Sequence, residues 1–395
     1  MTEIFIQKSN DKREIALVEE DKLIEYYEEN ENSNRNEGNI YIGIVRDIIK
    51  GMEAAFVDIG TNKNSFIHLK DILPKVDETK THEEQKLEIT DVIKPKQKIL
   101  VQVKKDSNSK KGARVSTHIN LPSKYIVLMP NTDIITVSQK IEDKKEQQRL
   151  IKLVKNNLSE GNGAIIRTLA EGKEQEIIDD IKKIEKVWRN ITQTSIDPEE
   201  NKAKLLYKSK DILEKILMDL MDENISRIVV NSQAEKSRIE KMLNENKEYK
   251  NIKVELKKQK DILEIYDLRK QVEKSENRKV WLKCGGFITI DNTEALTAID
   301  VNTGKFTGTN NDLQQTILKV NEEATIEIAK QLRLRDIGGI IIVDYIDMAK
   351  EQDKQNILDL MKKELKNDRA KTQVEGFTKL DLMELTRKHI CSHKE

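Results

Sequence analysis

The chain has 395 residues, which is enough for roughly two or three domains. Its 70 basic and 70 acidic side chains cancel, so the net charge of zero neither favours nor excludes nucleic acid, whose binding needs only a local basic patch. The 2 cysteines lie far apart, which excludes a disulfide framework, and the lack of an apolar leader or of a run near the ~20 residues of a membrane span predicts a cytoplasmic protein without membrane association.

The first 119 residues are predicted to be rich in β-strands. Short alternations of apolar and polar side chains predict a small meander over residues 3–26. Residues 40–119 then read as about five short strands punctuated by glycines, which favours a small barrel of the OB type.

The middle of the chain mixes helices and strands. Leu150, Val154 and Leu158 share one face of a helix predicted over residues 141–158, and "GNGAIIRTLAEG" predicts a buried strand that ends at Arg167. Residues 214–278 alternate between the two patterns and predict a small α/β unit, which includes one helix over residues 262–274.

From residue 279 the pattern predicts a layered α/β domain. It consists of a hairpin around Gly285 and Gly286 and the elements that follow. These are strand 295–301, a long amphipathic helix 313–332, a buried strand of four to five residues within 338–348, helix 352–365, strand 372–376 and helix 380–387.

Two apolar strands in this last region each end in an aspartate. Because side chains alternate along a strand, Asp300 and Asn302 face the same side, whereas Asp344 and Asp347 face opposite sides. Asp344 ends its apolar run, at the carboxyl end of the strand where α/β sites form, so it is the predicted partner of Asp300. Two carboxylates and an amide oxygen suit Mg²⁺ and the hydrolysis of a phosphodiester, with unrelated loop caps as the alternative interpretation.

Three further sets of side chains have the chemistry that holds a nucleic-acid strand. Phe56 and Phe66 either stack unpaired bases on the barrel surface or form part of its core. The basic run "KKDSNSKKGAR" either follows a phosphate backbone or is a solvated loop. Arg167 and Thr168 combine a guanidinium fork with a hydroxyl, which suits a terminal phosphate.

Three segments, in order along nearly the whole chain, resemble the ribonuclease E/G family of bacterial endoribonucleases. They are "NIYIGIVRDIIKGMEAAFVDIGTNKNSFIHLKDI", "GGFITIDNTEALTAIDVNTGKF" and "EIAKQLRLRDIGGIIIVDYIDM". The resemblance implies an α/β multidomain fold, and the chain is most similar to the compact, ribonuclease G-like type. The expected parts are an RNase H-like subdomain (1–38 with 214–278), an S1-like OB-fold (39–119), a 5′-sensor region (120–213) and a DNase I-like catalytic domain (279–395).

The resemblance also implies roles for individual residues. Asp300 and Asp344 would hold Mg²⁺, with Mn²⁺ as a possible substitute, and Asn302 would orient the reacting groups. Phe56, Phe66, Lys105 and Lys111 would contact single-stranded RNA, and Arg167, Thr168 and Val127 would form the pocket for its 5′-monophosphate. The expected activity is cleavage of single-stranded A/U-rich RNA in ribosomal and transfer RNA processing and messenger decay. The alternative is a non-catalytic RNA-binding protein derived from this family.

The C-terminal sequence departs from the family pattern. Members usually carry a CPxCxG-like knuckle in which two subunits share a zinc ion, whereas this sequence ends "LTRKHICSHKE". Cys391 and His393 supply two residue types that bind zinc, but the second cysteine of the knuckle is missing, so a structural zinc link is in doubt. A homodimer is expected, with any higher assembly left open.

Overall fold

A computed structural model describes residues 1–30, 35–72, 88–107, 111–194, 202–220, 225–244, 252–304, 313–366 and 368–391. The chain forms two compact units, one made of Met1–Ser33 with Asp219–Lys394 and the other of Asn34–Met218. The finer domain boundaries expected from the sequence stay predictions. Within the described residues, no helix is long and apolar enough to cross a membrane.

A five-stranded sheet in the first unit joins segments that are more than two hundred residues apart in the sequence. Its strand order is β15-β14-β1-β2-β3. The strands are β1 (Thr2–Ser9), β2 (Lys12–Glu19), β3 (Lys22–Asn30), β14 (Ile225–Val230) and β15 (Lys253–Leu256). The meander β1–β2–β3 is antiparallel, whereas β14 runs parallel to both β1 and β15. The predicted meander therefore folds together with the predicted α/β unit.

Two short helices cover this sheet where the sequence predicted one. They are α6 (Ile262–Ile265) and α7 (Leu268–Ser275). The prediction of a continuous helix is wrong because Asp267 adopts a left-handed conformation with φ of +53°, which interrupts the helical backbone. Leu263 and Leu268 nevertheless lie in the same core as Phe5, so the apolar spacing was identified correctly while the break was not.

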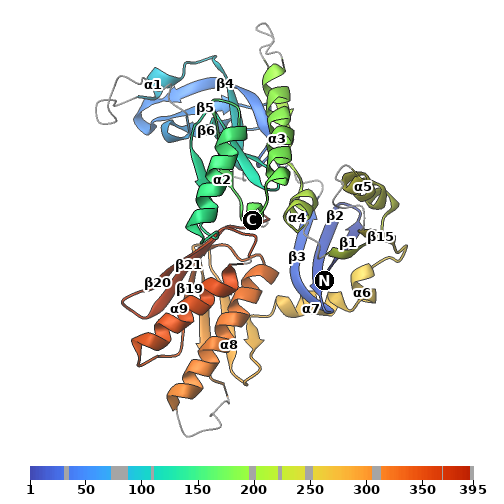
Figure 1. Cartoon of the computed structure of the whole chain (residues 1–395), viewed down its shortest axis with the longest axis vertical. Helices are drawn as coiled ribbons and strands as arrows, with labels where there is room; N and C mark the ends of the chain where they lie inside the picture. The colour runs from blue at the N-terminus through green and yellow to red at the C-terminus, as the bar shows by residue number, and fades with distance from the viewer. Residues whose placement is uncertain are drawn as a thin grey trace. The chain divides into compact units, whose positions relative to one another are not determined.

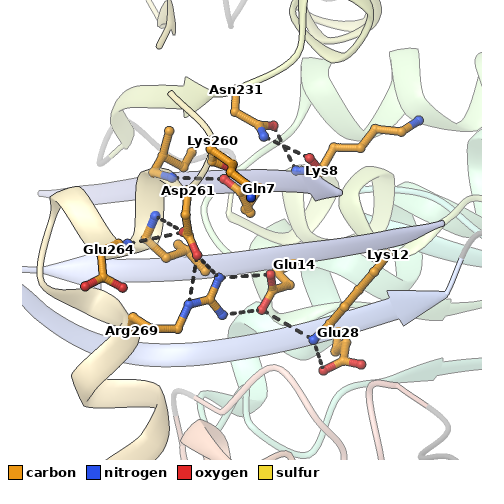
Figure 2. A network of polar contacts seen from close by, with 12 residues as sticks. Gln7, Lys8, Lys12, Glu14, Glu28, Asn231, Lys260, Asp261, Glu264 and Arg269 are labelled. Atoms are coloured by element: carbon orange, nitrogen blue, oxygen red, sulfur yellow. Dashed lines mark hydrogen bonds and ion pairs between the residues drawn. The ribbon is translucent and has the colours of Figure 1, made fainter. Parts of the chain in front are cut away.

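Partly buried polar contacts link these helices to β1 and β2 (Figure 2). Arg269 donates from Nη1 to Glu14 Oε1 at 2.6 Å and from Nη2 to Asp261 Oδ2 at 2.6 Å. The side chain of Gln7 donates to the carbonyl of Lys260 and accepts from the backbone N–H of Ile262. Burial opposes the ionisation of Glu14, but hydrogen bonds from Arg269 and Tyr26 outweigh it and lower the pKa of Glu14.

A six-stranded sheet, with order β16-β17-β18-β19-β21-β20, forms the rest of the first unit. Its strands are β16 (Lys279–Trp281), β17 (Phe287–Asn292), β18 (Leu296–Asn302), β19 (Gly339–Asp344), β20 (Thr372–Phe377) and β21 (Leu382–Arg387). Helices α8 (Leu313–Leu334) and α9 (Glu351–Leu365) lie side by side along one face (Figure 1) and share a core with the strands. Along β18, Ile299 and Val301 face this core while Asp300 is exposed on the other face.

The segment 380–387, predicted as a helix, is mostly strand β21. Its buried side chains, Met383, Leu385 and Arg387, recur at every second position, and Glu384 and Thr386 between them are exposed. That spacing fits a strand with one buried face rather than a helix, so the helix prediction is wrong.

A buried ionic cluster ties the end of β21 to the start of β19. Arg387, 2% exposed, donates from Nη1 to Asp336 Oδ1 and from Nε to Asp368 Oδ2, both at 2.8 Å. Asp336 also accepts from the backbone N–H groups of Ile390 and Cys391. The guanidinium of Arg387 thus contacts both buried carboxylates.

The second unit contains a closed five-stranded barrel, which is consistent with the expected OB-like domain. Its strands are β4 (Ile40–Ile49), β5 (Ala54–Asp58), β6 (Ser65–His68), β7 (Lys98–Lys105) and β8 (Arg114–Ser116). The barrel closes because β4 pairs with both β5 and β7, and β13 (Lys204–Tyr207) adds to β4 outside the closed ring. Val57, Ile67 and Val101 are among the side chains that fill its core.

A four-stranded sheet with order β11-β12-β10-β9 completes this unit. Its strands are β9 (Leu121–Pro122), β10 (Ile126–Pro130), β11 (Ile135–Val137) and β12 (Asn162–Ile166), and its helices are α2 (Lys144–Asn157) and α3 (Gln175–Gln193). Helices and sheet share a core that includes Leu150, Val154 and Ile166. The remaining elements are η1 (Lys50–Met52), η2 (Leu69–Asp71), α1 (Ile89–Val92), η3 (Thr168–Ala170), α4 (Ile212–Leu220) and α5 (Gln233–Asn244).

Replacing Arg387 by Met should lower the free energy of unfolding of the first unit by about 3–5 kcal/mol, because it removes the guanidinium that contacts both buried carboxylates, Asp336 and Asp368. Urea unfolding followed by Trp281 fluorescence in a Trp188→Phe background would measure the change in this unit. Arg278→Met is the matched control, since it breaks the pair with Asp291 on a side chain that is 69% exposed and should change stability far less than Arg387→Met. Equal effects of the two variants would contradict the role given to Arg387.

Candidate active site

Asp300 and Asp344 are direct neighbours across two strands. The parallel register of β18 and β19 pairs their Cα atoms, and both side chains are exposed on the sheet face opposite α8 and α9. Adjacent strands lie about 4.7–4.9 Å apart, so both carboxylates occupy a small region of this face. The structure thus brings together the two aspartates that the sequence selected, while Asp347 lies in the segment beyond β19.

Asn302 completes the group. It lies two residues beyond Asp300 on the same strand, and its Nδ2 donates to Asp300 Oδ2 at 2.5 Å. This hydrogen bond fixes one oxygen of the Asp300 carboxylate. The amide oxygen of Asn302 does not take part in it and could serve as a further ligand for a cation.

Three negatively charged side chains, Asp300, Asp344 and Asp347, lie close enough together to repel one another. Partial burial, followed by the charges of Asp300 and Asp347, raises the pKa of Asp344 above its usual range. A cation bound between Asp300 and Asp344 would offset this repulsion, which is a physical reason for a metal to bind here.

The donor set fits a hard cation that keeps much of its water. In the described part of the chain, no group of three or more Asp, Glu, His or Cys residues is placed to surround a metal. Mg²⁺ does not require such a cage, because it is usually held by one or two carboxylates with several waters. The pair with Asn302 matches that requirement and offers no sulfur or imidazole to favour zinc.

A second group forms a row across the outer surface of the barrel. Phe56 pairs with Phe66, Phe66 with Arg114, and Arg114 with Lys105 in the strand registers. The two rings are 6.2 Å apart between centroids at an interplanar angle of 71°. Both are partly exposed, whereas their strand neighbours Val57 and Ile67 fill the core. The interpretation of these phenylalanines as barrel core is therefore wrong.

The row also contains a residue that the sequence did not single out. Arg114 donates to both oxygens of Asp71 at 2.9 Å, which holds the guanidinium at the barrel surface. Its only signal was its place in the basic run, and the strand pairing is what puts it beside Phe66. Lys111 is exposed three residues before it.

The predicted phosphate-sensing residues lie at one end of the four-stranded sheet. Arg167 follows β12 directly, and its Nη1 donates to the carbonyl of Ser123 at 2.8 Å. Val127 pairs with Ile165, and both are less buried than the core-facing residues that flank them along their own strands. The hydroxyl of Thr168 lies 3.1 Å from that of Ser138. The structure therefore gathers these residues close to one strand end.

Of the two predicted zinc ligands, Cys391 and His393, the structure describes only Cys391. Cys391 is 6% exposed, and its backbone N–H donates to Asp336 Oδ2 at 2.7 Å. His393 lies outside the described residues, so the pair as a zinc site stays a prediction.

A family model and individual relatives both relate this chain to the same family of ribonucleases. Residues 120–390 match the model of the Ribonuclease E/G family. The chain is 38% identical over 392 residues to "Ribonuclease G" of Escherichia coli K12, covering 98% of this chain and 79% of the relative. It is 36% identical over 392 residues, with the same coverage of both chains, to "Ribonuclease G" of Haemophilus influenzae. It is also 37% identical over 359 residues to "Ribonuclease E" of a Nostoc species, covering 89% of this chain and 51% of the relative.

Replacing Asp344 by Asn should stabilise the protein when divalent ions are removed, because it relieves the repulsion from Asp300 and Asp347. The gain should be a few tenths to about 1 kcal/mol, since the carboxylates are exposed to screening solvent. Thermal unfolding in EDTA measures it. Glu384→Gln removes one negative charge from the same sheet face opposite Ile342 and should have less effect. A lower unfolding temperature for Asp344→Asn would contradict this account.

Proposed function

The chain belongs to the ribonuclease E/G family and is an endoribonuclease, and we propose that it uses Mg²⁺ to hydrolyse single-stranded, A/U-rich RNA to 5′-phosphate and 3′-hydroxyl ends. The observation that carries this proposal is the register of Asp300 with Asp344 on an exposed sheet face. An exposed face gives an extended RNA strand access to the carboxylates without unfolding of the protein.

Asp300, Asp344 and Asn302 divide metal binding and positioning between them in the proposed reaction. Asp300 and Asp344 would hold the metal, with Mn²⁺ able to take the same oxygen donors. When bound, the metal would neutralise charge on the phosphate and lower the pKa of the attacking water. Asn302 keeps the Asp300 carboxylate in one orientation and offers its amide to the phosphate or the water.

RNA binding is assigned to the row on the barrel. Phe56 and Phe66 are partly exposed on the barrel surface and would stack unpaired bases, an interaction worth ~1–3 kcal/mol for each base. Lys105, Lys111 and Arg114 would attract the phosphates between those bases. Because stacking accepts any base, this surface accounts for retention of a single strand and not for a strict sequence requirement.

The end of the four-stranded sheet is proposed to sense the 5′ end of the RNA. The guanidinium of Arg167 would bind a terminal monophosphate, with the hydroxyl of Thr168 as a second donor. Val127 would lie against the first nucleotide. The enzyme would therefore cleave RNA that carries a 5′-monophosphate faster than RNA that carries a 5′-hydroxyl.

The wider assignments are proposed on the same family resemblance. They are an RNase H-like subdomain (1–38 with 214–278), an S1-like barrel (39–119), a 5′-sensor (120–213) and a DNase I-like domain (279–395). We propose a cytoplasmic homodimer that acts in ribosomal and transfer RNA processing and in messenger decay.

Asp300→Asn and Asp344→Asn should each lower kcat/KM for a 5′-labelled single-stranded oligonucleotide by more than about a hundredfold. The reason is that even groups that only orient metal ligands are worth ~10–100-fold. The assay follows cleavage with Mg²⁺ and with EDTA, and Glu384→Gln serves as the control. RNA binding without any metal-dependent cleavage by the wild type would indicate a non-catalytic RNA-binding protein instead.

Arg167→Ala should narrow the rate difference between 5′-monophosphorylated and 5′-hydroxyl substrates by about tenfold or more, since a charged hydrogen bond is worth ~1.5–3 kcal/mol. The rate for the 5′-hydroxyl substrate should change little. Paired kinetics on the two substrates provide the measurement. An unchanged ratio would remove Arg167 from the sensing role.

A further inference from the structure

Two aromatic rings and a lysine form a cluster at the edge of the six-stranded sheet. Trp281 of β16 is 61% exposed, and its ring centroid lies 5.4 Å from that of Phe287 on β17 at an interplanar angle of 61°. The Nζ of Lys279 lies 4.0 Å from the Trp281 ring centroid and 3.5 Å from the Phe287 ring centroid. This cation contacts both rings while Trp281 leaves most of its surface to solvent.

The cluster lies in register with the carboxylate group. Trp281 pairs with Phe287, and Phe287 pairs with Asn302. Two residues along, Lys279 pairs with Thr289, and Thr289 pairs with Asp300, whose own partner is Asp344. Since paired residues on neighbouring strands point to the same face, the aromatic rings and the carboxylates share one surface. Trp281 is two strand spacings, about 10 Å, from Asn302.

Close backbone packing fixes the position of the hairpin that carries the cluster. A Cβ atom added at Gly286 would meet the carbonyl oxygen of Asn302 at 2.8 Å, and one added at Gly304 would meet that of Gly285 at 2.5 Å. The backbone N–H of Cys284 donates to Glu323 of α8 at 2.8 Å. The hairpin therefore packs directly against the end of β18 and against α8, so the distance between rings and carboxylates is held by the fold.

The core does not account for the exposed indole. Val280, between Lys279 and Trp281, packs against the core, so alternation directs the two flanking side chains to the outer face. An indole that remains 61% exposed beside a cation stabilises the fold little, yet it offers the flat apolar surface on which a base stacks.

We propose that Trp281 and Phe287 form a subsite that stacks one unpaired base of the RNA beside the carboxylate pair, with Lys279 contacting a neighbouring phosphate. The identification of the occupant as RNA rests on the proposed function of Asp300 and Asp344. Single-stranded RNA is favoured over another protein surface because rings, cation and carboxylates are aligned along the strand registers of one exposed face. A base held there would fix which phosphate reaches Asp300 and Asp344.

Fluorescence of Trp281 tests this proposal without cleavage. The chain has 2 tryptophans, so Trp188→Phe leaves Trp281 as the single reporter. Titration with a single-stranded RNA oligonucleotide in EDTA should quench it saturably, because a stacked base contacts the indole. An oligonucleotide of the same length with abasic sites throughout should produce much less quenching. Equal quenching by both oligonucleotides, or none by either, would overturn the proposal.

Kinetics on the otherwise unmodified protein give an independent test. Trp281→Ala should raise KM for single-stranded RNA about five- to a hundredfold, the range expected for one lost stacking contact, and Trp281→Phe should restore most of the loss. Leu380→Ala removes another exposed apolar side chain, which is 80% exposed, and should leave KM unchanged. Equal KM values for Trp281→Ala and the wild type would overturn the subsite.

The outcomes separate this proposal from the proposed function. Quenching by RNA in EDTA, with no Mg²⁺-dependent cleavage by the wild type, would support the base subsite and refute the hydrolytic role. Cleavage without quenching would do the reverse. Trp281 fluorescence that depends on protein concentration and not on RNA would identify a contact between two copies of the chain and overturn the RNA subsite.

Discussion

The repulsion between two carboxylates across the β18–β19 register is the constraint around which the candidate active site is built. Asp300 and Asp344 are neighbours because Ile299 and Val343, on the opposite face, pack into the core under α8 and α9. A slip of one residue in either strand would turn its aspartate toward that core. The free energy gained by burying the apolar face thus maintains an arrangement that is electrostatically unfavourable on the exposed face, and the proposed cation would offset that repulsion.

The strands around this pair are held by contacts that do not involve the carboxylates. Arg387 anchors β21, which pairs with β19 on the side away from β18, through Asp336 and Asp368. On the other side of β18, the glycine-rich hairpin packs closely against the residues that follow Asp300. The positions of β18 and β19 are therefore fixed by the buried core, by β21 on one side and by the hairpin on the other. Their exposed face remains accessible to a substrate.

Alternation and apolar runs predicted the features that depend on local sequence. They gave the small barrel, the two apolar strands that carry Asp300 and Asp344, the shared face of Asp300 and Asn302, and Asp344 as the neighbour of Asp300. They failed where the outcome depends on contacts distant in sequence. Strand β21 was taken for a helix because its period of two is visible only when Arg387 is recognised as a buried residue, which requires Asp336 and Asp368. Arg114 and Trp281 gain their neighbours from strand registers that local sequence does not encode.

We propose that Asp300 and Asp344 together hold one divalent cation. Electron paramagnetic resonance of Mn²⁺, titrated into the wild type and into the Asp300→Asn, Asp344→Asn double variant, measures this directly. The account predicts one bound Mn²⁺ per wild-type chain, displaced by excess Mg²⁺, and loss of that site in the double variant. Equal Mn²⁺ binding by the two proteins would contradict it.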